Sequence, residues 1–333
     1  MKTQKIASVI LCISAFLCFN VEKANAFDSG YKGIFEICNG INYSELTFDL
    51  IDGLIVIPVS INGGEKLNFI LDTGTRSPII LNKKYVKNLK LPLSRTMSFQ
   101  GAGNGSLVSG RVVPIMSLQV GDAIAAHIGG VLLDKNPLSN LVIQNKKIHG
   151  VIGATLFRSF AVEIDYPTHT IRLHKNDAFL DKNLYSEHEM KIDSSRPVVS
   201  VEVKTELGEL PLSLMIDTGF NNNLLLYDPN QQYHQPGKLQ TIGKGYSGNI
   251  KATVRQIKSI KLADRQIFDV NTYFPSNKSY KKSSDEGYDQ RDGIIGNKLL
   301  LQFCIVFDYA HEKLYLQEHL LNIPSSLAKE VTN

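Results

Sequence analysis

Hydrophobic and polar residues alternate along much of the chain in short stretches, a pattern that predicts a mainly β protein. A first set of β-rich stretches covers 54–61, 67–71, 107–120 and 131–133. A second set covers 198–203, 210–216, 250–262 and 267–273. Turn sequences such as Asn62-Gly63-Gly64 separate the strands. The helical signals are short, at 154–160 and 297–303, so strands are expected to form most of both halves.

One motif ends an apolar strand in each half of the chain. Asp72-Thr73-Gly74 returns as Asp217-Thr218-Gly219, 145 positions later. An apolar-apolar-glycine motif follows each copy, and its last glycine lies 81 residues after the first aspartate and 79 after the second. These motifs read Gly150-Val151-Ile152-Gly153 and Gly293-Ile294-Ile295-Gly296. A period this long predicts a duplicated unit rather than a solenoid of short repeats.

Length and composition agree with two folded units, with one large domain as the alternative. The chain has 333 residues, and a domain typically takes about 150. Its 43% hydrophobic residues are enough to bury a core, which excludes a disordered or collagen-like chain. The 36 Lys and Arg nearly balance the 32 Asp and Glu, so nucleic acid is not an expected partner.

The first 26 residues have the pattern of a secretory signal peptide. Two lysines precede an uncharged run from Ile6 to Phe19, and Ala24-Asn25-Ala26 fits the small-x-small cleavage rule, which places the cut before Phe27. No later stretch reaches the roughly 18 uninterrupted apolar residues of a membrane span. We therefore expect an exported chain without an integral membrane segment.

Cysteine usage refines the expected location. Only Cys38 and Cys304 remain after the predicted cleavage, and so few cysteines favour a bacterial protein, periplasmic or secreted. The two cysteines either form one disulfide or are two small buried side chains.

An aspartate at the end of an apolar strand is costly to ionise if it is buried, unless donors or a charge stabilise it. The glycine that follows brings a peptide N–H close to the carboxylate, and the threonine offers a hydroxyl to backbone across an interface. If the halves pack as pseudo-twofold partners, Asp72 and Asp217 meet and share one proton. Such a pair holds a general base and a general acid in one site.

The two Asp-Thr-Gly copies and the two apolar-apolar-glycine motifs resemble aspartic proteases of the pepsin and retropepsin type. The size of each half makes bacterial retropepsin-like proteases, fused in tandem, the closer likeness. The resemblance covers roughly residues 50–320. It implies two homologous β-barrel lobes related by a pseudo-twofold axis, and peptide hydrolysis by water held between two aspartates.

That resemblance assigns the site residue by residue. Asp72 and Asp217 are the expected catalytic residues, and which of them starts ionised stays open. The expected supporting residues are Thr73, Gly74, Thr75, Thr218 and Gly219. The mechanism requires no cofactor, and the scattered histidines lack a metal-binding spacing, so no metal site is expected.

Glycine-rich hairpins are the expected covers of the cleft. The candidate flap residues are Gly101, Gly103 and Gly105 in the first half and Gly243, Gly245, Tyr246 and Gly248 in the second. Such glycines would let the hairpins open over an extended peptide, although ordinary surface turns are the alternative. Tyr246 is either a substrate-facing residue or an exposed hairpin tyrosine.

Two positions break the symmetry between the halves. Thr75 follows the first motif with a hydroxyl, whereas Phe220 follows the second and offers none, which puts the second aspartate's competence in doubt. His149 stands where the second half has Asp292, as a structural histidine or as one that tunes the site.

We thus expect an exported aspartic endopeptidase that acts on peptides or proteins as a single-chain pseudo-dimer, functional as a monomer. The alternative, motivated by Phe220, is a non-catalytic peptide-binding protein on the same scaffold. The expected divisions are a signal peptide at 1–26, an N-terminal extension at 27–50, a first lobe at 51–175, a linker at 176–196, a second lobe at 197–320 and a tail at 321–333.

Overall fold

The computed structural model describes most of the chain after residue 32. The described residues are 33–37, 40–99, 101–103, 105–135, 142–143, 146–176, 178, 182–228, 237–262, 264–276 and 291–318. Outside them lie the predicted signal peptide and tail, Cys38, and Asn104, which stands between the flap residues Gly103 and Gly105. Neither of the two α-helices in the described part has the length or the apolar character that crossing a membrane needs.

The first half forms a nine-stranded sheet, called here the first-half sheet, in the order β1-β9-β6-β12-β5-β4-β8-β7 with β3 beside β4. Its strands are β1 (Glu36–Ile37), β3 (Asp49–Ile51), β4 (Leu54–Ile61), β5 (Leu67–Leu71), β6 (Ile79–Ile80), β7 (Thr96–Phe99), β8 (Val108–Val120), β9 (Ala123–Leu133) and β12 (Gly150–Ile152). The turns η1 (Lys83–Tyr85) and η2 (Lys87–Leu89), the pair β10 (Val142–Ile143) and β11 (Lys146–Lys147), and helix α1 (Ala154–Phe157) complete it.

The second half repeats this scheme in an eight-stranded sheet, the second-half sheet, ordered β16-β17-β18-β23-β19-β22-β21-β20. Its elements are β16 (Lys191–Asp193), β17 (Arg196–Thr205), β18 (Gly208–Asp217), β19 (Leu224–Leu226), β20 (Gln240–Gly245), β21 (Gly248–Leu262), β22 (Arg265–Pro275), β23 (Gly293–Gly296) and helix α2 (Asn297–Leu300). In both halves the aspartate-bearing strand lies parallel to the apolar-apolar-glycine strand, as β5 with β12 and β18 with β23.

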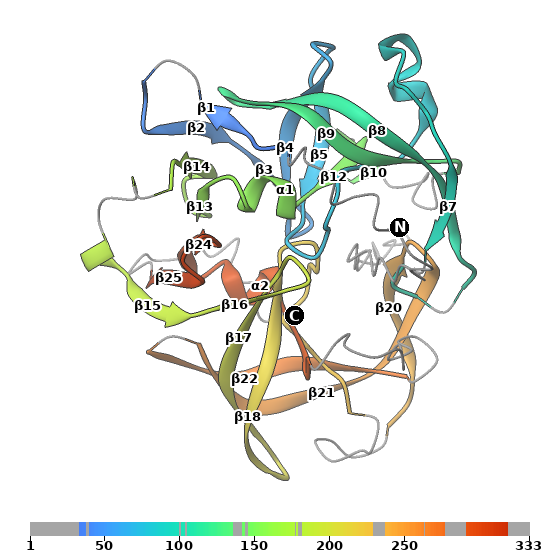
Figure 1. The fold of residues 1–333 in the computed structure, drawn as a ribbon. Helices are drawn as coiled ribbons and strands as arrows, with labels where there is room; N and C mark the ends of the chain where they lie inside the picture. Colours follow the sequence, from blue (N-terminus) through green and yellow to red (C-terminus); the bar gives the residue numbers. More distant parts are fainter. Residues whose placement is uncertain are drawn as a thin grey trace, which may run out of the picture.

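A third sheet, the bridging sheet, joins the halves. Figure 1 shows it to the left, between the first-half sheet above and the second-half sheet below. Its six strands are ordered β15 (Ser186–Glu189), β25 (Lys313–Glu318), β24 (Phe303–Asp308), β13 (Ala161–Asp165), β14 (Thr170–His174) and β2 (Tyr43–Thr47). Strands β2 and β15 come from the expected N-terminal extension and linker, and β15 follows the turn η3 (Lys182–Leu184). The bridging sheet thus draws on every part of the described chain.

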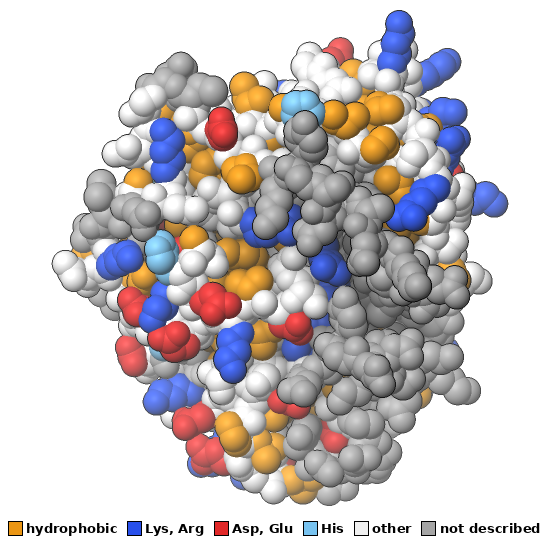
Figure 2. All heavy atoms as spheres, viewed as in Figure 1, with side chains coloured by type: hydrophobic (Ala, Val, Ile, Leu, Met, Phe, Trp, Pro, Cys, Tyr) orange, Lys and Arg blue, Asp and Glu red, His pale blue; other side chains and the backbone are white. Residues whose placement is uncertain are grey.

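The main apolar core runs through this bridge into both halves. Phe157 of α1 packs edge-on against Phe307 of β24 and stacks on Tyr309, at centroid distances of 5.3 and 5.5 Å. Of the three smaller clusters in the described part, one lies in each half and one lies on the bridging sheet. Charged side chains of both signs are spread over the face seen in Figure 2.

A buried ionic cluster lies on the bridging sheet around Glu163. Its carboxylate accepts from Arg172 at 2.7 Å and contacts His174 Nε2 at 2.7 Å. Burial raises the pKa of Glu163, but the bonds from His174 and Arg172 outweigh it and leave the pKa below its ordinary value. Cys304 lies beside this carboxylate as a free thiol, and burial raises its pKa to about 12, so the thiol stays protonated.

The lowered pKa predicts a pH-dependent contribution of Glu163 to stability. The contribution is present above the ordinary value of 4.5 and is lost as the pH falls through the lower folded-state pKa. We expect Glu163→Gln to lower the free energy of unfolding at pH 7 by about 1–3 kcal/mol, since it weakens charge-assisted hydrogen bonds. Urea unfolding from pH 7 to pH 3.5 checks this, and a constant difference between variant and wild type would contradict it.

Candidate active site

The two Asp-Thr-Gly motifs occupy equivalent positions at the ends of β5 and β18. Asp72 directly follows β5, and its N–H donates to Ile152 of the parallel strand at 2.9 Å. Asp217 is the last residue of β18 and pairs with Gly296. Both aspartates are fully buried. The parallel pairing carries each aspartate to the same edge of its sheet, facing the other half.

The glycines that end the apolar-apolar-glycine motifs allow the closest backbone contacts of the site. A Cβ on Gly153 would lie 1.9 Å from the carbonyl oxygen of Asp72. A Cβ on Gly296 would lie 2.2 Å from the carbonyl oxygen of Asn222 in the matching loop. No side chain fits at either distance, so this motif serves to bring a strand against the aspartate loop.

The two loops hold each other through their threonines. The Thr73 hydroxyl accepts from Thr218 N at 3.1 Å and donates to Ile216 O at 2.7 Å. The Thr218 hydroxyl accepts from Thr73 N at 3.1 Å and donates to Leu71 O at 2.8 Å. These four buried hydrogen bonds, called here the threonine contact, cross the boundary between the halves and set the distance between the aspartates.

The carboxyl groups of Asp72 and Asp217 meet at this boundary. A Cβ on Gly219 would lie 2.4 Å from Asp72 Cγ, so the glycine of the second motif lies against the carboxyl group of the first. A Cβ on Gly74 would lie 3.0 Å from Asp72 Oδ1 and 3.2 Å from Asp217 Oδ2. Two carboxylates at contact repel, so the pair takes up one proton and hydrogen-bonds through it.

The hydrogen-bond donors around Asp72 and Asp217 are not identical. Its carboxylate accepts from Gly74 N at 2.7 Å and from the Thr75 hydroxyl at 2.9 Å. Asp217 accepts from Gly219 N at 2.8 Å. Phe220 at the position equivalent to Thr75 is turned into the second-half apolar cluster, edge-on to Tyr273. The asymmetry that the sequence predicted between Thr75 and Phe220 is therefore present in the geometry.

Burial and these donors act on Asp72 in opposite directions. Burial raises the pKa of Asp72 and dominates, while Thr75, Asp217, Gly74 and Arg196 each pull it down, so the pKa stays above its ordinary value of 3.8. A carboxyl group with a raised pKa is able to exchange protons under mildly acidic conditions. A pair that shares one proton holds one protonated and one ionised carboxyl group.

Arg196 was missed as a site residue, since it lies at the end of the expected linker. It is the first residue of β17, its side chain is buried, and its Nε donates to Gly74 O at 3.0 Å. The only signal in the sequence is an arginine directly before a proline and an apolar strand. That pattern alone is typical of a solvated charge.

The two candidate flaps pack against each other across the boundary. Gly101 N donates to the Ser247 hydroxyl at 2.9 Å, and Ser247 N donates to Ala102 O at 3.0 Å. A Cβ on Gly103 would lie 2.4 Å from Gly248 O. The glycines at this crossing let two backbones approach closely, a role that the sequence interpretation, which stressed opening, did not include.

Further flap glycines fit the same picture. A Cβ on Gly105 would lie 2.1 Å from Ser247 O, and one on Gly245 would lie 2.2 Å from Ala102 O. Gly243 lies in β20, next to a shift in the register with β21. These segments are therefore not ordinary surface turns.

Tyr246 is not an exposed hairpin residue. It is 2% exposed and belongs to the apolar cluster of the first half, edge-on to Phe99 at 6.4 Å. Conversely, Ala102 of the first flap belongs to the apolar cluster of the second half. Burial, and next to it the charge of Asp72, raise the pKa of Tyr246. Each flap tip thus packs on the opposite half, and Tyr246 reaches toward the aspartates.

His149 lies away from the aspartate pair. Its Nδ1 accepts from Asn68 N at 2.9 Å, near the start of β5, and its ring packs edge-on against Tyr85 at 4.5 Å. Burial and the neighbouring Lys147 lower the pKa of His149. Its contacts are those of a structural histidine.

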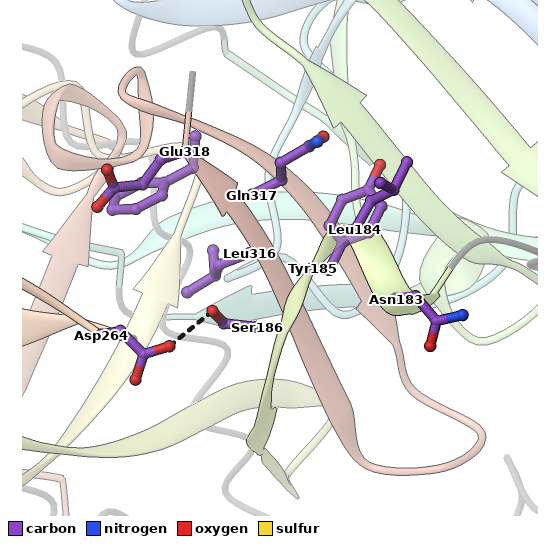
Figure 3. Close-up of a pocket in the computed structure, with 9 residues that line it drawn as sticks. Asn183, Leu184, Tyr185, Ser186, Asp264, Leu316, Gln317 and Glu318 are labelled. Carbon is purple, nitrogen blue, oxygen red and sulfur yellow. Dashed lines mark hydrogen bonds between the residues drawn. The ribbon is translucent and has the colours of Figure 1, made fainter. Parts of the chain in front are cut away.

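A polar recess of about 310 Å³ lies at the edge of the bridging sheet (Figure 3). Ser186 donates to Asp264 there at 2.8 Å, and neither Asp72 nor Asp217 lines it. Within the described part of the chain, no three His, Cys, Asp or Glu side chains are grouped as metal ligands. The aspartate pair is thus the arrangement with the clearest chemistry.

A comparison with models of protein families finds one match, in the first half of the chain. Residues 57–156 match the family model described as aspartyl protease, a stretch that holds the first Asp-Thr-Gly motif. The fold is similar to basic 7S globulin from soybean, with a TM-score of 0.48 and 10% identity over 83% of this chain and 95% of that chain. No curated protein sequence matches the chain. With two equivalent sheets and a bridging sheet, the described chain has the bilobal, aspartic-protease-like β fold that the sequence predicted.

The threonine contact predicts a sharp difference between two substitutions. Thr73→Val leaves Thr218 N–H and Ile216 C=O buried without this partner, and each such loss costs about 1–3 kcal/mol. We expect Thr73→Val to lower the free energy of unfolding by roughly 2–6 kcal/mol in denaturant titrations. Thr73→Ser keeps the hydroxyl and serves as the control; equal losses in both variants would contradict the assignment.

The raised pKa of Asp72 predicts that this residue costs stability near neutral pH. A carboxyl whose folded-state pKa is raised contributes most below its ordinary value of 3.8, and that contribution is lost as the pH rises through the folded-state pKa. We expect Asp72→Asn to gain melting temperature relative to wild type between pH 3.5 and pH 7. Calorimetry at both pH values measures the difference in melting temperature between variant and wild type. A difference that is smaller at pH 7 than at pH 3.5 would contradict the prediction.

Proposed function

We propose that the protein is an exported aspartic endopeptidase that hydrolyses peptide bonds with water activated between Asp72 and Asp217. The observation that carries the proposal is the close approach of the two buried carboxyl groups to the same glycine, Gly74, with each aspartate at the end of an equivalent strand. The match of residues 57–156 to the aspartyl protease family model supports it. The threonine contact adds support, since it orders both loops without involving the carboxylates.

In the proposed reaction the pair begins with one proton. The ionised aspartate removes a proton from water as the water oxygen attacks the scissile carbonyl carbon. The protonated aspartate hydrogen-bonds the carbonyl oxygen, where negative charge develops. A proton then passes to the nitrogen as the carbon–nitrogen bond breaks. Burial strengthens each of these interactions, because little water screens them.

The proposed substrate is an extended peptide segment of a peptide or protein. The two flap tips contact each other, and the charge of Asp72 acts on Tyr246 of the second flap. We infer that a substrate parts the contact between Ala102 and Ser247 to reach the aspartates. An extended segment would then pair with the freed flap backbones as an added strand. Both aspartates come from one chain, so a monomer contains the complete pair. Export rests on the signal-peptide pattern of residues 1–26, and we propose a periplasmic or secreted location.

The proposal predicts that each aspartate is essential. Asp72→Asn and Asp217→Asn should each lower kcat at least about 100-fold, since each removes one proton-transfer partner. The measurement is cleavage of a peptide library by chain 27–333 from pH 3 to pH 7. Asp269→Asn is the matched control, because Asp269 is exposed and has a φ of 54°, which asparagine tolerates well.

The same assay separates catalysis from binding alone. Cleavage that persists in either aspartate variant would overturn the proposal. Peptide binding without cleavage by the wild-type chain at every pH would favour the alternative, a peptide-binding protein on a protease scaffold. The position of Phe220, where Asp72 has the Thr75 hydroxyl, motivates that alternative.

A further inference from the structure

Arg196 is a buried cation at the boundary between the halves. It is 6% exposed, and its guanidinium Nε donates to the carbonyl oxygen of Gly74 at 3.0 Å. Gly74 belongs to the first Asp-Thr-Gly loop, whereas Arg196 begins β17 of the second half. Burial of a guanidinium group has a large desolvation cost, which interactions with this loop must offset.

The equivalent position in the first half carries no charge. Val56 pairs with Ile70, two residues before Asp72, and Val198 pairs with Met215, two residues before Asp217. Leu54 is therefore the counterpart of Arg196, and it is buried in the first-half apolar cluster. The turn before Leu54 lies against Asn221, whose Nδ2 donates to Asp52 O at 3.0 Å. Strand β4, which starts beside the second Asp-Thr-Gly loop, thus begins with Leu54. Strand β17 begins with Arg196, whose guanidinium lies beside the first loop.

The charge of Arg196 affects Asp72. The charge of Arg196 lowers the pKa of Asp72, in the same direction as the Thr75 and Gly74 hydrogen bonds and against the larger effect of burial. Burial, then the charge of Asp72 and, more weakly, that of Asp217 raise the pKa of Tyr309, whereas Arg158 and Arg196 lower it. The pKa of Tyr246 is likewise raised, and Arg158 acts on Tyr309 and bonds Ser195. Among these groups, Arg196 is the cation that acts on Asp72.

We propose that Arg196 is a positioning residue that keeps the negative charge of the pair on Asp72 and the shared proton on Asp217. The inference rests on the proposed function and assigns the two roles within it. Asp72 takes the proton of the attacking water while Asp217 gives its proton to the carbonyl oxygen, which forms a gem-diol. Asp72 then passes its proton to the nitrogen as the carbon–nitrogen bond breaks, and the diol returns a proton to Asp217.

The first test follows the two carboxyl groups by carbon-13 NMR of labelled aspartate, which needs no activity. Asp72 is titrated in Asp217→Asn, and Asp217 is titrated in Asp72→Asn. We expect Asp72 to titrate at least about one pH unit lower than Asp217, the lower end of the effect of a nearby opposite charge. Equal midpoints, or a lower midpoint for Asp217, would overturn the inference whether or not the protein cleaves peptides.

The second test adds Arg196→Met to the Asp217→Asn background. The Asp72 midpoint should rise by about one pH unit, and Arg196→Lys, which keeps the charge, should restore most of the shift. Arg158→Met is the matched control, since this arginine bonds Ser195 beside Arg196 and is not among the groups that shift the pKa of Asp72. An unchanged midpoint in Arg196→Met, or the same rise in Arg158→Met, would refute the role of Arg196. If Arg196→Met does not fold, Arg196→Gln replaces it with the same expected rise.

The pH profile of kcat/KM distinguishes this inference from the proposed function. In the otherwise wild-type chain, Arg196→Met should move the acidic limb of the profile upward by about one pH unit, with Arg196→Lys between the two. Cleavage with an unmoved acidic limb would leave the protease proposal standing and remove the role of Arg196. If the wild type does not cleave peptides but the NMR midpoints are as expected, the protease proposal is overturned and the role of Arg196 stands.

Discussion

The site depends on four hydrogen bonds between two threonines and the backbone of the opposite loop. Thr73 and Thr218 each accept one N–H and donate to one carbonyl across the boundary, so all the groups involved are paired although all are buried. This contact brings two acidic groups to one point, a juxtaposition that their mutual repulsion opposes. The bridging sheet and the shared core hold the halves in register around it.

The surroundings of the pair balance opposing electrostatic effects. Burial favours the neutral carboxyl, while peptide N–H groups, the Thr75 hydroxyl and Arg196 favour the charged one. The crossed flaps add to the burial, because Tyr246 packs into the opposite half close enough to feel the charge of Asp72. A parting of the flaps would admit water and change the same balance, so access to the site and its proton affinity are physically linked.

Local patterns in the sequence were sufficient to predict many of the strands and both motif pairs. The stretch 67–71 is strand β5, and the apolar-apolar-glycine motifs are β12 and β23. What the sequence did not predict depends on contacts between distant segments. Nothing near Tyr246 indicates that it packs beside Phe99, and nothing near Arg196 indicates that its charge lies beside Gly74. The polar stretch expected to be a linker contains β15 and β16, because backbone pairing with β25 and β17 outweighs its hydrophilic composition.

Strands β13 and β24 pair across the boundary so that Glu163 lies opposite Val306, and these two residues are themselves equivalent in the repeat. In an assembly of two identical chains, a residue near the symmetry axis would meet its own copy, and a buried carboxylate there would face another carboxylate. Covalent joining of the halves removes that restriction. It permits an arginine where the other half has a leucine, or a threonine where the other half has a phenylalanine, and so allows one aspartate to differ chemically from its twin.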